Sequence, residues 1–120
     1  MMKFDHLAIP VSDVGRSRNW YVSERGLTVE FEVAERRFIA RQDSEGFAIF
    51  LQEAPAPVQP GGCAPWFQVE DVEATFVAWS ARGIAFAHGP QKSYWGYGAE
   101  LVDPDGYRVR LWDERSMNAK

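Results

Sequence analysis

Two halves of the chain carry the same order of structural signals, which indicates an internal repeat. Asp13 and Asp71 are 58 residues apart, and each stands at the N-cap position before a helix-like stretch. Gly26 and Gly83 follow those stretches as helix stop signals. One strand-like run precedes each helix and three follow it. In the first half we expect a helix at 14–25 and strands at 4–11, 28–33, 37–42 and 47–52. In the second half we expect a helix at 72–82 and strands at 65–69, 84–87, 98–102 and 107–112. The sequence therefore predicts an α+β fold in which the unit strand, helix, three strands occurs twice.

Length and composition place both modules in a single domain, residues 1–120. The chain has 46% hydrophobic and 25% charged residues with a formal charge of −4, which is typical of one ordinary globular domain. We expect module one at 3–53, a linker rich in Pro and Gly at 54–63, module two at 64–113 and a short C-terminal tail at 114–120.

The composition also excludes several classes of function. No apolar stretch approaches the roughly 20 residues of a membrane span, and the first residues lack the pattern of a secretory signal. Cys63 is the only cysteine, which excludes an internal disulfide and a cysteine-cluster zinc site. The chain has no run of Lys or Arg of the kind that indicates nucleic-acid binding. We therefore expect a cytoplasmic protein with no membrane and no nucleic-acid partner, whose acidic charge favours a neutral or cationic ligand.

The repeat, together with His6 in DHLAIPVSDV and the ending WGYGAELVDPDGYRVRLW, resembles the vicinal oxygen chelate superfamily. This group includes glyoxalase I, extradiol dioxygenases and bleomycin resistance proteins. The resemblance covers residues 3–113 and implies two βαβββ modules whose mixed sheets form an open, U-shaped cleft with the helices outside. It also implies a homodimer with ligand clefts at its interface.

The same resemblance implies where a metal would bind. Metal enzymes of this superfamily hold four ligands on the first and last strands of the two modules, and these positions here carry His6, Phe50, Ala64 and Arg110. Alanine and phenylalanine have no lone pair to donate, and arginine is permanently cationic. A catalytic metal normally has about three protein ligands. We therefore expect no metal and no other cofactor, and His6 by itself is more typical of a hydrogen-bonded strand histidine.

Residues two apart on a strand share a face, so these positions predict further residues of the cleft wall. The hairpin register that the resemblance implies adds Glu100, and the offset of 60 between the last strands of the two modules adds Phe38. The predicted ligand-binding residues are His6, Phe38, Phe50, Gln52, Trp66, Gln68, Trp95, Glu100, Arg110 and Trp112. Their rings would stack on a flat ligand while the few polar groups orient it, or the aromatic residues simply fill the cleft. Trp95 lies in an aromatic run at 93–97 that fits a mobile flap and a turn equally well. On the opposite face, Tyr107, Val109 and Leu111 should pack as core.

Glu100 and Arg110 carry opposite charges, and the hairpin register that the resemblance implies makes them face each other across the last hairpin. Three roles stay open for them. They form a salt bridge at the former metal position, they are a purely structural pair, or Arg110 binds a ligand carboxylate through its planar guanidinium.

Two classes of function follow from this pattern. The first is a non-enzymatic protein similar to bleomycin resistance proteins, which sequesters an aromatic ligand or antibiotic. The alternative is a glyoxalase-like lyase, an isomerase or a dioxygenase-like enzyme that acts on a small metabolite, with Glu100 as general base or a metal near His6. A vestigial cleft with a role in partner binding is a third possibility. The changed ligand positions and the aromatic wall favour the first class, and no catalytic residue is assigned.

Overall fold

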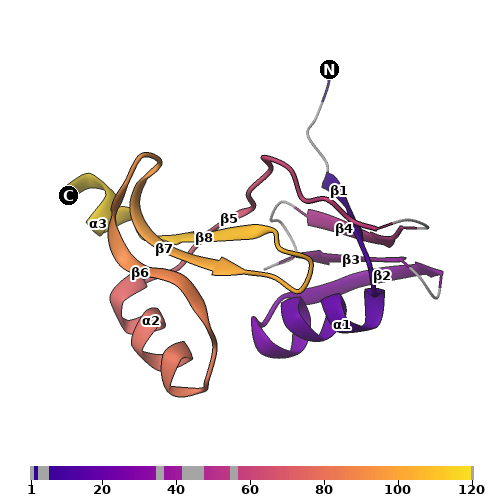
Figure 1. Ribbon diagram of the computed structural model, residues 1–120, viewed down its shortest axis with the longest axis horizontal. Coiled ribbons are helices and arrows are strands. Elements are labelled where there is room, and N and C mark those ends of the chain that lie inside the picture. The colour runs from indigo at the N-terminus through magenta and orange to yellow at the C-terminus, as the bar shows by residue number, and fades with distance from the viewer. Residues whose placement is uncertain (1, 3–5, 35–36, 42–47, 55–56, 120) are drawn as a thin grey trace. The chain divides into compact units, whose positions relative to one another are not determined.

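The computed structural model describes residues 2, 6–34, 37–41, 48–54 and 57–119 (Figure 1). At residues 6, 28–34, 37–41 and 48 it describes the backbone alone. The expected linker, strands and tail include several residues outside the described ones: Phe4, Asp5, Gln42, Phe47, Pro55, Ala56 and Lys120. The chain divides into two compact units, residues 1–59 and 60–120, and the boundary falls within the expected linker.

The first unit contains one mixed four-stranded sheet and one helical segment. Its elements are β1 (His6–Val11), α1 (Val14–Arg18), the π-helical segment η1 (Asn19–Glu24), β2 (Thr28–Ala34), β3 (Arg37–Arg41) and β4 (Ala48–Glu53). The strand order is β1-β4-β3-β2, with β1 parallel to β4 and the other neighbours antiparallel. The helix expected at 14–25 is therefore present, but its second half is wound more widely than an α-helix.

The second unit repeats this topology. Its elements are β5 (Trp66–Gln68), α2 (Val72–Ala81), β6 (Phe86–Ser93), β7 (Gly96–Val102), β8 (Arg108–Trp112) and α3 (Glu114–Ala119). The strand order β5-β8-β7-β6 is the counterpart of the first sheet, again with only the first pair parallel. The α+β fold with two βαβββ modules is thus confirmed. Strands β6 and β7 are longer than expected and meet at a two-residue turn, and the expected tail contains α3.

The predicted helix ends are confirmed in both modules. The side chain of Asp13 accepts a hydrogen bond from a backbone N–H in the first turn of α1, and Asp71 does the same for α2. Gly26 and Gly83 have φ angles of 82° and 84°, which side chains with a Cβ rarely adopt. None of the helices in the described part of the chain is long and apolar enough to cross a membrane.

Alternation along the strands separates a core face from an exposed face in each sheet. In β1 and β4 the core residues are Ile9, Val11, Ile49 and Leu51, whereas Ala8, Pro10 and Gln52 are exposed. The predicted core residues Tyr107, Val109 and Leu111 are all buried, whereas Arg108 between them is exposed. The face that carries the candidate site in the second sheet is therefore the one opposite this core.

An acidic residue at the end of each last strand binds the start of its module's helix. Glu53 Oε2 accepts a hydrogen bond from the Val14 N–H at 3.1 Å, and Asp113 Oδ2 accepts one from the Val72 N–H at 2.7 Å. The first N–H groups of a helix have no partner within the helix and attract negative charge. Both modules therefore tie the last strand to the helix with a carboxylate.

Asp113 is the more enclosed of these two acids, with 1% of its surface exposed. Its Oδ1 also accepts a hydrogen bond from the Ser116 N–H at 2.7 Å. Burial by itself raises the pKa of Asp113, but the hydrogen bonds from Val72 and Ser116 and the charge of Arg115 outweigh burial and lower the pKa. A lowered folded-state pKa stabilises the protein above the unfolded-state value of about 3.9, and this contribution is lost as the pH falls toward the folded-state value.

We expect Asp113→Asn to lower the free energy of unfolding at pH 7 by about 1–3 kcal/mol, because the amide keeps one acceptor oxygen and loses the charge. The difference from the wild type should shrink as the pH falls below about 4. Urea unfolding at several pH values measures both effects. Glu53→Gln is the matched control and should cost less, because Glu53 is only partly buried. A variant as stable as the wild type at pH 7 would contradict this role of Asp113.

Candidate functional site

One row of residues crosses all four strands of the second sheet. Trp66 in β5 lies opposite Arg110 in β8, which in turn lies opposite Glu100 in β7. Glu100 also lies opposite His88 in β6. Residues directly opposite one another project to the same face of a sheet, so these four side chains share one face. The predicted placement of Glu100 across from Arg110 is confirmed.

Glu100 forms ion pairs with two arginines. Arg110 Nε donates to Oε2 at 3.2 Å, and Arg108 Nη1 donates to Oε1 at 3.3 Å. Glu100 is only 8% exposed, and a buried carboxylate is tolerated when it is paired. The side chain of Arg110 is 15% exposed and that of Arg108 is 54% exposed, so the pair with Arg110 is the enclosed one. Two guanidinium groups on one carboxylate leave a formal charge of about +1 at this place.

Three aromatic rings surround the Arg110 guanidinium. Its central carbon lies 5.9 Å from the ring centre of Trp66, 5.4 Å from that of Tyr94 and 5.2 Å from that of Trp95. A cation within about 6 Å of a ring centre is attracted by the ring. Arg110 Nη2 also donates to the Tyr94 hydroxyl at 2.6 Å. We call Trp66, Tyr94, Trp95, Glu100 and Arg110 the Arg110 cluster.

Rings within the cluster also contact one another. Trp66 and Trp95 meet edge to face with their ring centres 5.2 Å apart. Trp95 is tilted against the ring of His88, 6.1 Å away. Because Trp95 lies in the turn between β6 and β7 while Trp66 lies in β5, these contacts connect the hairpin tip to the far edge of the sheet.

The structure brings four of the ten predicted site residues together in the cluster: Trp66, Trp95, Glu100 and Arg110. Gln68 and Trp112 lie opposite each other in β5 and β8, two positions beyond Trp66 and Arg110. They therefore form the next row on the same face. Gln68 is exposed and Trp112 is half-buried.

The other predicted residues lie in the first sheet. Phe50 is half-buried and lies opposite Ala8, and Gln52 is exposed two positions further along β4. The prediction that Phe38 shares a face with Phe50 is wrong, because the register places Phe38 opposite the core residue Leu51. Ile39 takes the place opposite Phe50. His6 begins β1, and its side chain lies outside the part that the structure describes.

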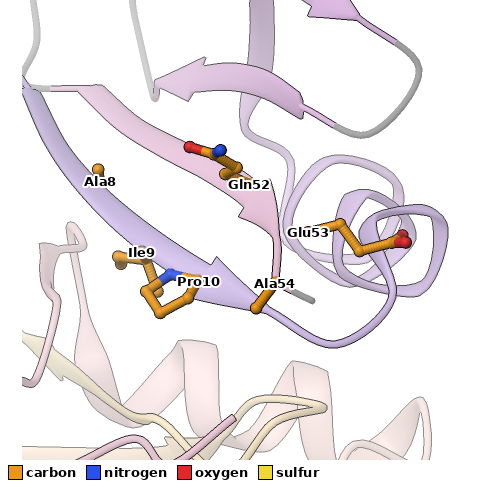
Figure 2. A pocket seen from close by; sticks show the side chains of 6 residues that line it. All are labelled: Ala8, Ile9, Pro10, Gln52, Glu53 and Ala54. Carbon is orange, nitrogen blue, oxygen red and sulfur yellow. The ribbon is translucent and has the colours of Figure 1, made fainter. Parts of the chain in front are cut away.

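A small hollow lies on the first unit where β1 and β4 end (Figure 2). It has a volume of about 210 Å³ and is lined by Ala8, Ile9, Pro10, Gln52, Glu53 and Ala54. The Glu53 side chain points away from Gln52 and toward the helix whose first N–H it binds (Figure 2). Ligand pockets usually start at about 300 Å³, so this hollow suits a small group rather than a whole ligand.

Two residues at the site were missed by the sequence prediction. The strand expected at 84–87 ended one residue before His88, and the Gly89-Pro90 pair that follows is typical of a strand break. Strand β6 instead continues to Ser93, with irregular register on both sides of His88. Tyr94 belongs to the aromatic run at 93–97, which was the available signal, but nothing in the sequence fixed its contact with Arg110.

The match to a known family covers most of the chain. The model of the Glyoxalase/Bleomycin resistance protein/Dioxygenase superfamily matches residues 3–111. The chain belongs to this superfamily. No curated protein matches it.

Several solved structures share the fold of this superfamily member. An antibiotic binding protein, TnmS3 from Streptomyces sp. CB03234, is 24% identical, with 94% of this chain and 96% of that chain covered and a TM-score of 0.77. A glyoxalase/bleomycin resistance protein from the same organism is 25% identical, with coverage of 91% and 98% and a TM-score of 0.70. Protein ATC0852 from Agrobacterium tumefaciens is 26% identical, with coverage of 94% and 98% and a TM-score of 0.73.

The residues at the metal positions do not fit the metal of the superfamily's metal enzymes. Phe50 presents a half-buried apolar ring, and Ala64 has no donor atom. Arg110 places a fixed positive charge 3.2 Å from Glu100, where a metal ion would be repelled. No three His, Cys, Asp or Glu side chains in the described ranges gather closely enough to hold a metal ion. We therefore derive no chemistry through a metal.

Gly98 lies where the Arg110 cluster meets the backbone of β8. A Cβ at Gly98 would lie 2.2 Å from the carbonyl oxygen of Leu111 and 2.7 Å from the ring of Trp95. We expect Gly98→Ala to displace Trp95 and to lower the free energy of unfolding by about 1–3 kcal/mol.

Urea unfolding and the near-ultraviolet spectrum of the tryptophans measure this effect. Gly62→Ala is the matched control, because a Cβ there meets nothing within 4 Å. It should change the free energy of unfolding by less than about 0.5 kcal/mol. Equal stability of the two variants would show that Gly98 is not needed for the close approach of Trp95.

Proposed function

We propose that the protein binds a planar aromatic small molecule at the Arg110 cluster and sequesters it without chemical change. The observation that carries this proposal is the cluster itself, in which an enclosed guanidinium is held among three rings. Trp66 is 45% exposed, so part of its ring is free to stack on a ligand. Such a contact contributes about 0.5–1.5 kcal/mol beyond the area it buries.

Membership in the superfamily supports binding of a small molecule. One similar structure is described as an antibiotic binding protein and another as a glyoxalase/bleomycin resistance protein. Together with a donor set that does not fit a metal, this likeness favours sequestration over the metal-dependent reactions of the superfamily. An antibiotic or another aromatic metabolite is the ligand class that we propose.

The contacts of Glu100 argue against a role as general base. A general base needs an oxygen within hydrogen-bond reach of the proton that it removes. Each carboxylate oxygen of Glu100 already accepts a hydrogen bond from a guanidinium group. The pair is therefore better suited to holding Arg110 in place than to moving a proton.

A metal-free lyase or isomerase is the second candidate, and His88 is the observation that favours it. His88 lies opposite Glu100, and its Nδ1 is 2.8 Å from the carbonyl oxygen of Gly89. If Nδ1 donates to that oxygen, Nε2 is the ring nitrogen left with a lone pair that can accept a proton. Consumption of a ligand during incubation would favour this candidate.

A matched pair of tryptophan variants tests the binding site. We expect Trp66→Ala to weaken binding of quinoxaline by about 2- to 10-fold, because the stacking surface is lost. Isothermal titration calorimetry measures the affinity, and chromatography of the mixture shows whether quinoxaline is recovered unchanged. Trp79→Ala on α2 is the control: its ring contacts Phe86, so the substitution should lower stability and leave binding intact. Binding that does not depend on Trp66, or loss of the probe, would overturn the proposal.

We also propose that the protein works as a cytoplasmic homodimer, as bleomycin resistance-like members of the superfamily do. Exposed aromatic surface such as that of Trp66 favours association with a partner. Sedimentation at micromolar concentration should then give about twice the chain mass of 13.6 kDa. A monomer over a wide dilution series would contradict the dimer and would leave the binding measurement unaffected.

A further inference from the structure

We propose that the aromatic ligand carries an anionic oxygen group, such as a carboxylate, which binds the Arg110 guanidinium in the place of the Tyr94 hydroxyl. This inference rests on the proposed function and names the ligand class of the same site. The inference goes beyond the proposed function because an aromatic wall by itself does not select between neutral, cationic and anionic ligands.

The Tyr94 hydroxyl marks the position of the anionic oxygen. It accepts a hydrogen bond from Arg110 Nη2 at 2.6 Å, although Tyr94 is 91% exposed at the tip of the hairpin. A side chain so exposed has few other contacts to lose when it is displaced. The guanidinium is charged already, and a carboxylate adds the opposite charge and can accept two parallel hydrogen bonds where the hydroxyl accepts one, so it would replace the hydroxyl with a net gain.

The arrangement of the guanidinium also suits a carboxylate. Glu100 takes the Nε side of Arg110, and Tyr94 takes Nη2. Among the described residues, Nη1 has no hydrogen-bond partner. Nη1 and Nη2 together form one edge of the planar group, and a carboxylate accepts two parallel hydrogen bonds from such an edge.

Charge at the cluster favours the same ligand. Arg108 and Arg110 share one carboxylate, that of Glu100, so the group is formally positive although the whole chain has a charge of −4. A cationic ligand would have to stack beside a guanidinium that already occupies the faces of Trp66 and Trp95. Like charges at contact repel, and the preference for a cationic ligand expected from the net charge is therefore reversed at this site.

Three naphthalene probes test the inference; they share the ring system and carry one substituent that is anionic, neutral or cationic. They are 2-naphthoate, 2-naphthylmethanol and 2-naphthylmethylammonium, titrated by isothermal titration calorimetry into the full-length protein at pH 7. We expect 2-naphthoate to bind about 10-fold more tightly than the neutral alcohol, and the ammonium compound to bind most weakly.

Variants assign the preference to its residues. Arg110→Gln should reduce the affinity for 2-naphthoate to that for the alcohol. Arg82→Gln, which removes an arginine at the end of α2, is the matched control and should keep the preference. Tyr94→Phe keeps the ring and removes the competing hydroxyl, so it should strengthen 2-naphthoate binding several-fold. If Arg110→Gln does not fold, the order of the three probe affinities, measured on the wild type and on Tyr94→Phe, tests the inference.

The outcomes separate this inference from the proposed function. Equal binding of all three probes, or tightest binding of the ammonium compound, overturns the anionic ligand and leaves aromatic binding intact. If Arg82→Gln also abolishes the preference for 2-naphthoate, the preference reflects the overall charge of the protein, and the role of Arg110 is overturned. Absence of binding by every probe overturns the proposed function and the inference with it.

Discussion

The buried ion pair between Glu100 and Arg110 is the interaction on which the candidate site depends. Removing a carboxylate from water costs several kcal/mol, and only close pairing offsets this cost. The Glu100 carboxylate forms one ion pair with Arg110 at 3.2 Å and a second with Arg108 at 3.3 Å. The pair fixes the Arg110 guanidinium on its Nε side, and the other side is then left to the aromatic rings and a ligand. Loss of Glu100 would leave the enclosed Arg110 guanidinium without a carboxylate, and breaking a buried pair in this way typically costs about 3–5 kcal/mol, whereas loss of Arg110 would leave Glu100 paired with Arg108.

The two modules keep the same framework and differ on the exposed faces of their sheets. A carboxylate after the last strand binds the first N–H of the helix in both, through Glu53 and Asp113. On the exposed faces, the paired residues Ala8 and Phe50 of the first sheet correspond to Trp66 and Arg110 of the second. The framework positions are constrained by helix capping and core packing. Positions on the exposed face are free of these constraints, and in the second module they carry the charge and aromatic surface of the Arg110 cluster.

The sequence predicted the fold and four of the five residues of the Arg110 cluster for physical reasons that can be named. N-cap residues, stop glycines and two-residue alternation are local signals, and they located the elements. The pairing of Glu100 with Arg110 came from the hairpin register that the family resemblance implies. The placement of Phe38 failed because it assumed one offset between modules for the last two strands. Phe38 and Leu51 are 13 residues apart, whereas the corresponding Ala99 and Leu111 are 12 apart. A shift of one residue moves a strand position to the other face. The bulged path of β6 hid His88 in the same way, since no local signal shows how a strand passes Gly89-Pro90.

The net charge of the chain and the local charge at Arg110 give opposite predictions for the charge of the ligand. The distance of each charge from the ligand decides which prediction holds. The chain's charge of −4 is spread over the whole sequence, and at physiological ionic strength exposed charges further away than about 8 Å are largely screened. The guanidinium of Arg110 lies within hydrogen-bond distance of Tyr94, at the place where a ligand atom would sit. The rings of Trp66 and Trp95 already contact the Arg110 guanidinium. A second cation would therefore gain little from stacking on these rings, whereas an anion would bind the guanidinium itself. An acidic protein can in this way carry a site for acidic aromatic ligands, because a few enclosed contacts outweigh a screened field.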